Sequence, residues 1–253
     1  MVLAMREFLI RICPAAIWGI VALETVIGAL LLVRGIRRKQ PISLWSGVLA
    51  LGLILDAALI GLGALLPAQV LRTVSPLRFV AHGLLIPLLF PICGYALGLR
   101  KPAMTGLWIF TCLLMAAGAA QAVVTKLELR ELAGVVRYAA GEGTPRWAEA
   151  VSRILSFGTV IPMMLAGIVV WIRKKNPCLF LSGLMMFAFS ALGPATGNTD
   201  LIFFISMFGE LLMILFLYLH AVTEGRKQHG SSRLPGARLF RPEKKTKQRN
   251  CKE

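Results

Sequence analysis

Seven long apolar stretches, separated by charged or turn-forming segments, constrain this chain more than any other feature of its sequence. A helix needs about 20 mostly apolar residues to cross the hydrocarbon core of a bilayer. The runs are long and lack the apolar–polar alternation of membrane strands, so we expect helices. The predicted spans are 14–33, 42–66, 79–99, 104–124, 148–172, 178–195 and 201–222.

The distribution of lysine and arginine predicts how these spans are oriented. Basic residues gather after spans one, three and five and in the C-terminal tail, whereas loop 126–147 carries nearly balanced charge. Cytoplasmic loops are the ones enriched in Lys and Arg, which places the N-terminus outside and the C-terminus in the cytoplasm. We therefore predict an all-α, seven-helix plasma-membrane protein, with a transmembrane domain at 1–223 and a basic, disordered cytoplasmic tail at 224–253.

Composition supports this class and excludes others. Hydrophobic residues make up 57% of the chain and charged residues 16%, with a net charge of +16. A soluble domain has about 25% charged residues, so neither an ordinary soluble fold nor a disordered chain is expected. The basic charge lies in short runs beside apolar segments, so we predict no nucleic-acid partner. Membrane lipids are the expected partners, with anionic lipid at the tail.

The segment 126–146 is the one sizeable loop on the predicted outer side. Its apolar residues intersperse with charges at roughly helical spacing, which predicts a short interfacial helix. Those apolar residues are Leu127, Leu129, Leu132, Val135 and Val136.

Three carboxylates, Glu24, Asp56 and Glu210, lie near the centres of three predicted spans. A charged residue at such a depth costs about 2.5–3.5 kcal/mol, and intramembrane ionisable residues usually face the bundle interior. One interpretation is a shared polar core that handles a proton or a cation, with at least one carboxylate protonated. The alternative is structural, because a protonated carboxyl can hold helices together by hydrogen bonds.

A second polar set lies toward the predicted outer ends of the spans. Two arginines, an imidazole and polar side chains at one mouth can clamp a carboxylate or a phosphate headgroup. Alternatively, the arginines extend to the interface and the histidine bonds a backbone carbonyl. The predicted ligand-binding residues are Arg78, His82, Gln121, Arg153 and Asp200.

The histidines do not predict a metal or haem site. His82 lies near the outer face, His220 near the inner end of the last span, and His229 in the tail. They are too far apart in depth to share one ligand shell, and HExxH, GxSxG and Walker patterns are absent from the sequence. We predict no cofactor and no metal.

The stretch Arg78-Phe-Val-Ala-His-Gly-Leu-Leu-Ile-Pro-Leu-Leu89 resembles the third helix of the microbial rhodopsins, where an arginine and an aromatic residue precede a Pro-Leu-Leu run. The seven-span layout is also similar to that family. The resemblance implies a related arrangement of helices. Ala81 occupies the position of the family's counterion carboxylate, and span 201–222 contains no lysine for a retinal Schiff base. It therefore implies no retinal photochemistry, and no functional residue is carried over.

The sequence as a whole favours a membrane protein that binds or transports a small anionic or zwitterionic solute or lipid, with the central carboxylates handling a proton or cation. Two alternatives stay open. One is an intramembrane lipid-modifying enzyme that uses the same carboxylates as acid and base. The other is a structural or assembly factor without a small-molecule site. We expect a binder or transporter rather than an enzyme.

Overall fold

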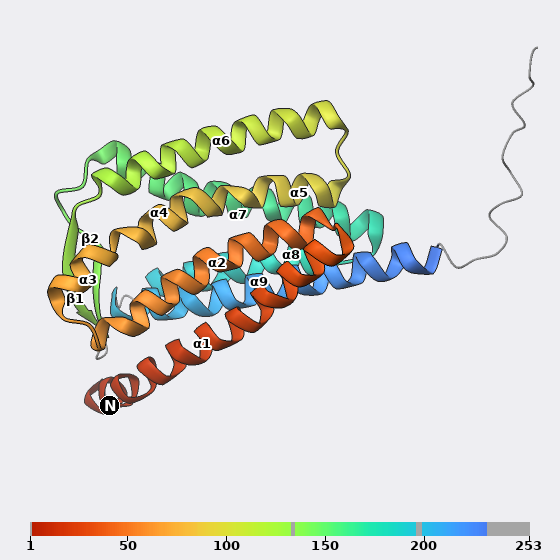
Figure 1. Cartoon of the computed structure of the whole chain (residues 1–253). Coiled ribbons are helices and arrows are strands. Elements are labelled where there is room, and N and C mark those ends of the chain that lie inside the picture. Colours follow the sequence, from red (N-terminus) through yellow and green to blue (C-terminus); the bar gives the residue numbers. More distant parts are fainter. Residues whose placement is uncertain (1, 133–134, 196–198, 232–253) are drawn as a thin grey trace, which may run out of the picture.

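In a computed structural model, which describes residues 2–132, 135–195 and 199–231, helices run back and forth between the two ends of an elongated bundle (Figure 1). Two short 3-10 turns, Leu62–Ala64 and Ile86–Leu88, interrupt them. The α-helices are α1 (Val2–Arg38), α2 (Pro41–Gly61), α3 (Ala68–Val74), α4 (Pro76–Leu85), α5 (Leu89–Leu97), α6 (Lys101–Val124), α7 (Arg146–Lys174), α8 (Cys178–Ala195) and α9 (Thr199–Ser231).

The lengths and composition of these helices make the chain a mainly helical, multi-pass membrane protein. Six described segments are long and apolar enough to cross a membrane, and a seventh apolar helix, Cys178–Leu192, is shorter. Large apolar side chains on the outside of the bundle, such as Leu113 and Ile172, suit contact with lipid. That the chain has seven spans, and that its N-terminus lies outside and its C-terminus in the cytoplasm, stay predictions.

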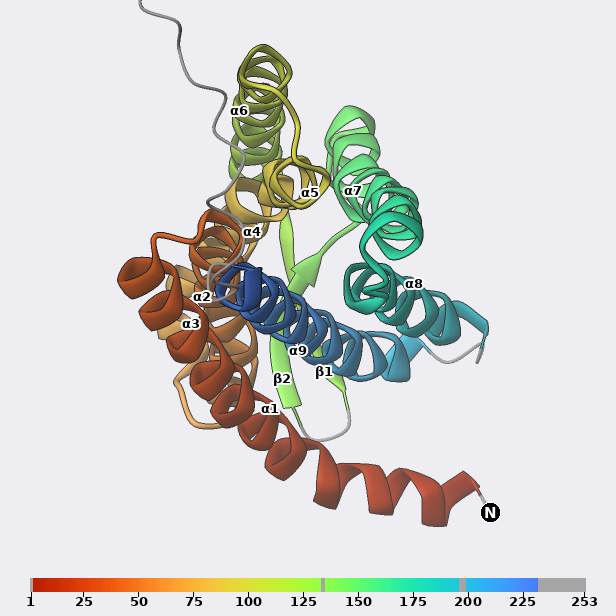
Figure 2. The ribbon, with the colours of Figure 1, turned by 90° about the vertical axis from the view of Figure 1, so that its right-hand side faces the viewer.

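One predicted element is wrong. The segment after α6 is not an interfacial helix but an antiparallel hairpin of β1 (Leu127–Leu132) and β2 (Val135–Ala140), which pairs Leu129 with Tyr138. Its first apolar residues are two positions apart and alternate with charges, which is the period of a strand. Adjacent valines and a tyrosine in β2 also favour a strand. The hairpin crosses one end of the bundle (Figures 1 and 2), which we call the hairpin end.

The third predicted span contains a break in its helical geometry. It runs through α4, the 3-10 turn and α5, with Pro87 inside the turn. Proline lacks the N–H that an α-helix needs, and its ring disfavours α geometry at the preceding residue. The α-helical pattern therefore ends at Leu85, just beyond the cavity-lining residues of α4.

The opposite end, which we call the tail end, is held by contacts to α9 from the ends of α1 and α7 and from Gln40, which lies between α1 and α2. The Arg34 Nη2 and Gln40 Nε2 atoms each donate to the carbonyl of Ala221 at 3.1 Å. Lys174 Nζ lies 2.9 Å from Glu224 Oε2. Helix α9 continues to Ser231, past the predicted domain boundary at residue 223. The rest of the predicted tail, 232–253, lies outside the described residues.

Two apolar clusters fill the bundle, with α9 packed against both α1 and α8 (Figure 2). The larger cluster joins five long helices and α5, and the smaller one lies toward the hairpin end. Members of the larger cluster include Leu31, Leu49, Ile92, Met163, Leu179 and Leu217. Members of the smaller cluster include Ile17, Ile20, Ala57, Ile60, Val135, Phe203 and Met207.

Candidate functional site

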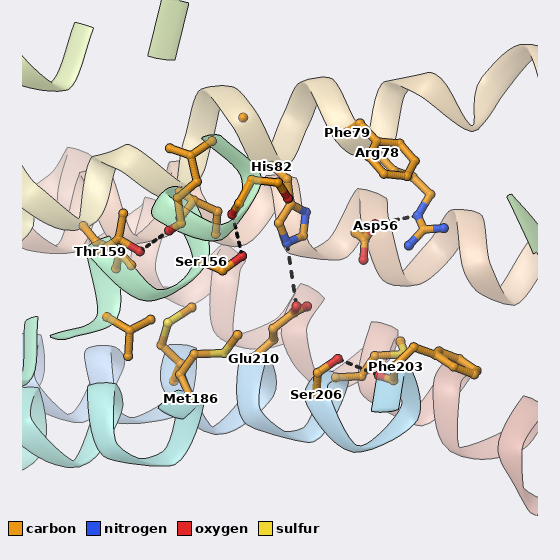
Figure 3. A pocket seen from close by; sticks show the side chains of 18 of the residues that line it. Asp56, Arg78, Phe79, His82, Ser156, Thr159, Met186, Phe203, Ser206 and Glu210 are labelled. Atoms are coloured by element: carbon orange, nitrogen blue, oxygen red, sulfur yellow. Dashed lines mark hydrogen bonds and ion pairs between the residues drawn. The ribbon is translucent and has the colours of Figure 1, made fainter. Parts of the chain in front are cut away.

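A cavity of about 260 Å³ lies in the half of the bundle nearest the hairpin, and α2, α4, α6, α7, α8, α9 and β2 all contribute to its lining (Figure 3). The apolar part of the cavity lining includes three methionines and two phenylalanines. The polar residues that line it are Asp56, Arg78, Gln121, Arg137, His82, Ser152, Ser156, Thr159, Ser206 and Glu210.

The strongest polar contact in the cavity joins α2 to α4. Arg78 Nε donates to Asp56 Oδ1 at 2.6 Å, and both residues are buried. Arg78 also donates through Nη1 to the carbonyl of Tyr138 at 3.4 Å, which ties the hairpin to the same site. A contact of this length is typical of a strong, charge-assisted hydrogen bond.

The second pair joins α4 to α9. His82 lies one turn after Arg78 and therefore on the same face of the helix. Its Nε2 atom is 3.7 Å from Glu210 Oε1, and Figure 3 shows the imidazole pointing toward this carboxyl. That distance is too long for a hydrogen bond. Glu210 is therefore held far less firmly than Asp56.

A second guanidinium, that of Arg137, enters the cavity lining from the hairpin. It lies over the ring of Phe203, 4.2 Å from the ring centroid, in a cation–π contact. Sequence reasoning missed Arg137 because it treated this segment as a helix at the interface. The alternation of β2 was the signal that could have found it, because every second residue of a strand faces the same side.

Hydroxyl oxygens of α7 form another wall. Ser156 Oγ donates to the carbonyl of Ser152 at 3.0 Å, and Thr159 Oγ1 donates to that of Leu155 at 2.7 Å. Since these hydroxyls donate to their own helix, their lone pairs are what they present to a ligand. They can accept hydrogen bonds from an ammonium, an amide or water.

Glu24 lies behind this cavity rather than in its lining. Its residue is 1% exposed, and neither carboxyl oxygen has a hydrogen-bond partner among the described residues. Helix α1 packs against α2 and α9, the helices that carry Asp56 and Glu210. Both of those carboxyls line the cavity.

The remaining predicted site residues lie in different surroundings. Gln121 lines the cavity, and its amide donates to Thr125 Oγ1 at 2.8 Å. The Arg153 side chain is 75% exposed and lies 3.2 Å from Glu149 Oε2, outside the cavity lining. Asp200 falls in the first turn of α9, and its side chain lies outside the described part of the structure.

Members of both predicted polar sets therefore line one cavity. Asp56 and Glu210 of the central set meet Arg78, His82 and Gln121 of the outer set around the same cavity. The carboxylates and the bases could be found from the sequence because they interrupt apolar spans. Their pairing across helices depends on rotation and packing, which the sequence pattern does not specify.

No protein-family model matches this chain, and no curated protein is similar to it.

Proposed function

We propose that this chain is a seven-span plasma-membrane protein that binds or transports a small anionic or zwitterionic solute or lipid group in the cavity near its hairpin. The central carboxylates handle a proton or cation. The N-terminus lies outside and the C-terminus in the cytoplasm, in a helix arrangement related to that of the microbial rhodopsins. The observation that carries the proposal is that Asp56, Arg78, His82 and Glu210 line one cavity.

The arrangement of charges supports a binder rather than an enzyme. Arg78 and Arg137 offer planar guanidinium donors that suit a carboxylate or phosphate. Glu210 and the α7 hydroxyls offer acceptors that suit the cationic end of a zwitterion. Each cavity carboxylate already faces a basic side chain. An acid/base pair would instead need two such groups poised on one scissile bond.

Ligand stabilisation tests this proposal. Purified protein is titrated with acetate, inorganic phosphate, glycine and glycerophosphocholine while its thermal unfolding is followed. Binding at about 100 times the dissociation constant should stabilise the fold by about 2.7 kcal/mol. Arg137→Gln should remove most of that increment, because the anion loses a guanidinium donor.

Arg153→Gln is the matched control, since Arg153 lies outside the cavity. The ligand should stabilise Arg153→Gln as much as it stabilises the unaltered chain. Each increment is measured from the variant's own unliganded melt, so the loss of the Arg137–Phe203 contact does not enter it. Equal increments in both variants would mean a general salt effect and no anion site at Arg137. A chain that none of the four probes stabilises would not be a binder of this class.

The orientation is tested separately with reporters. A reporter fused after Glu224 should behave as cytoplasmic, and one inserted near Gly143, beyond the hairpin, as extracytoplasmic. The basic connections at the tail end are the physical reason. Alkaline phosphatase and green fluorescent protein fusions read the two sides. Both positions on the same side would contradict the seven-span arrangement.

A further inference from the structure

Glu24 is the one predicted site residue with described side-chain atoms that is both fully buried and without a hydrogen bond. A buried ionised carboxylate with neither a donor nor a counter-ion costs far more than a neutral one. For the Glu24 carboxyl to be stable in this position, its charge must be neutralised by a bound proton or by a metal cation.

The surroundings of Glu24 favour the proton. Its neighbours one turn away on α1 are Ile20 and Ile27, which pack into the two apolar clusters on either side. Metal cations such as Ca²⁺ and Mg²⁺ need about six oxygen ligands, and no group of three or more His, Cys, Asp or Glu side chains in the described residues is placed to hold a metal ion. A proton needs only the carboxyl itself.

The three central carboxyls differ in what holds them. Asp56 has Arg78 at 2.6 Å, and Glu210 has only His82 at 3.7 Å. Glu210 is also 10% exposed at its side chain and lines the cavity. Glu210 therefore meets the cavity on a helix that also packs against α1.

We propose that Glu24 is a proton-binding site behind the cavity, and that its proton exchanges with water through Glu210. Because Glu24 has no direct hydrogen-bond partner among the described residues, a water molecule from the cavity carries the proton: the O–H bond on Glu24 breaks as the water takes that proton and gives one of its own to Glu210, so the negative charge moves from Glu210 to Glu24. Glu210 then releases its proton to water in the cavity, and the reverse step restores Glu24. The inference rests on the proposed function, because the cavity is the wet side of the route.

Several charged groups set the balance of this exchange. Asp56 on α2, Glu210 on α9, Arg78 and His82 on α4 and Arg137 on β2 all line the cavity. His82 is the basic side chain nearest to Glu210 in the cavity, at 3.7 Å.

Infrared spectroscopy of the full-length protein in lipid nanodiscs tests the inference without any ligand. A protonated buried carboxyl gives a carbonyl band, separate from the amide band, that shifts on hydrogen–deuterium exchange. Glu24→Gln should remove this band, and Glu24→Asp should keep one at a shifted position. Glu210→Gln should keep the Glu24 band but slow its exchange at least about tenfold. Glu149→Gln, which changes an exposed carboxyl, should alter neither property.

Three results would overturn the inference. The first is an exchange rate in Glu210→Gln equal to that of the unaltered chain, which would make Glu24 a packing group. The second is a band that appears only when sodium is replaced by choline, which would make Glu24 a cation ligand. The third is a band that survives Glu24→Gln. If Glu24→Gln does not fold, the band position in Glu24→Asp still decides the assignment. Loss of anion binding in Arg137→Gln is measured independently, so the two proposals can fail separately.

Discussion

Replacing Asp56 by Asn should lower the free energy of unfolding by about 3–5 kcal/mol, because it leaves a buried guanidinium without its counter-ion. Asp56 and Arg78 are 6% and 9% exposed, and the bond between them is 2.6 Å long. Arg78→Gln should cost a similar amount, since it leaves the carboxylate unpaired instead. Thermal and denaturant unfolding of the purified variants measure both effects.

The double variant makes the test specific to the pair. With Asp56→Asn and Arg78→Gln together, no unpaired charge remains, so the loss should be well below the sum of the two single losses. Additive losses would contradict a coupled buried pair and would leave each residue acting through separate contacts.

An exposed pair on α7 is the matched control. Glu149 and Arg153 are four residues apart, lie 3.2 Å from each other and have side chains 42% and 75% exposed. Such a pair contributes about 0.3–0.5 kcal/mol. Changing either member to Gln should therefore alter the unfolding free energy little, although the charge removed is the same.

The contrast between these two pairs also explains what the sequence could and could not predict. Arg78 and Arg153 were both expected at one outer mouth, because each lies near the start of a predicted span. Depth along a span follows from counting residues, but the direction in which a side chain points depends on the rotation of the helix. Rotation places Arg78 inward against Asp56 and Arg153 outward beside Glu149.

Apolar length predicted the helices well, because membrane helices must satisfy their backbone hydrogen bonds internally. That rule does not apply to the segments between the apolar runs, and there the prediction failed, at the hairpin. The period-two pattern of Leu127 and Leu129 covers few residues, and the mixture of apolar and charged residues over the whole segment favoured an interfacial helix instead. The predicted site did not include Arg137 for the same reason.

Substituting Gly83 by Val should also destabilise the fold, by about 1–3 kcal/mol, because it forces two backbones apart. A Cβ atom on Gly83 would lie 2.5 Å from the carbonyl oxygen of Gly118 and 2.6 Å from its carbonyl carbon. Backbone atoms cannot turn away as a flexible side chain can. Close approach through paired small residues is how membrane helices pack tightly, and here it joins α4 to α6.

Moving α4 away from α6 should change the cavity as well as the packing of the core. Gly83 lines the cavity and follows His82 directly, so moving α4 away from α6 would also move His82 relative to Glu210.

Gly106→Ala, elsewhere on α6, is the matched control: nothing lies within 4 Å of its added Cβ. That change should stabilise the helix by about 0.4–1 kcal/mol through a less flexible unfolded chain. Thermal melts of both variants give the stabilities, and the infrared exchange rate of Glu24 reports the cavity. If Gly83→Val melts like Gly106→Ala, the α4–α6 contact is not the tight crossing described.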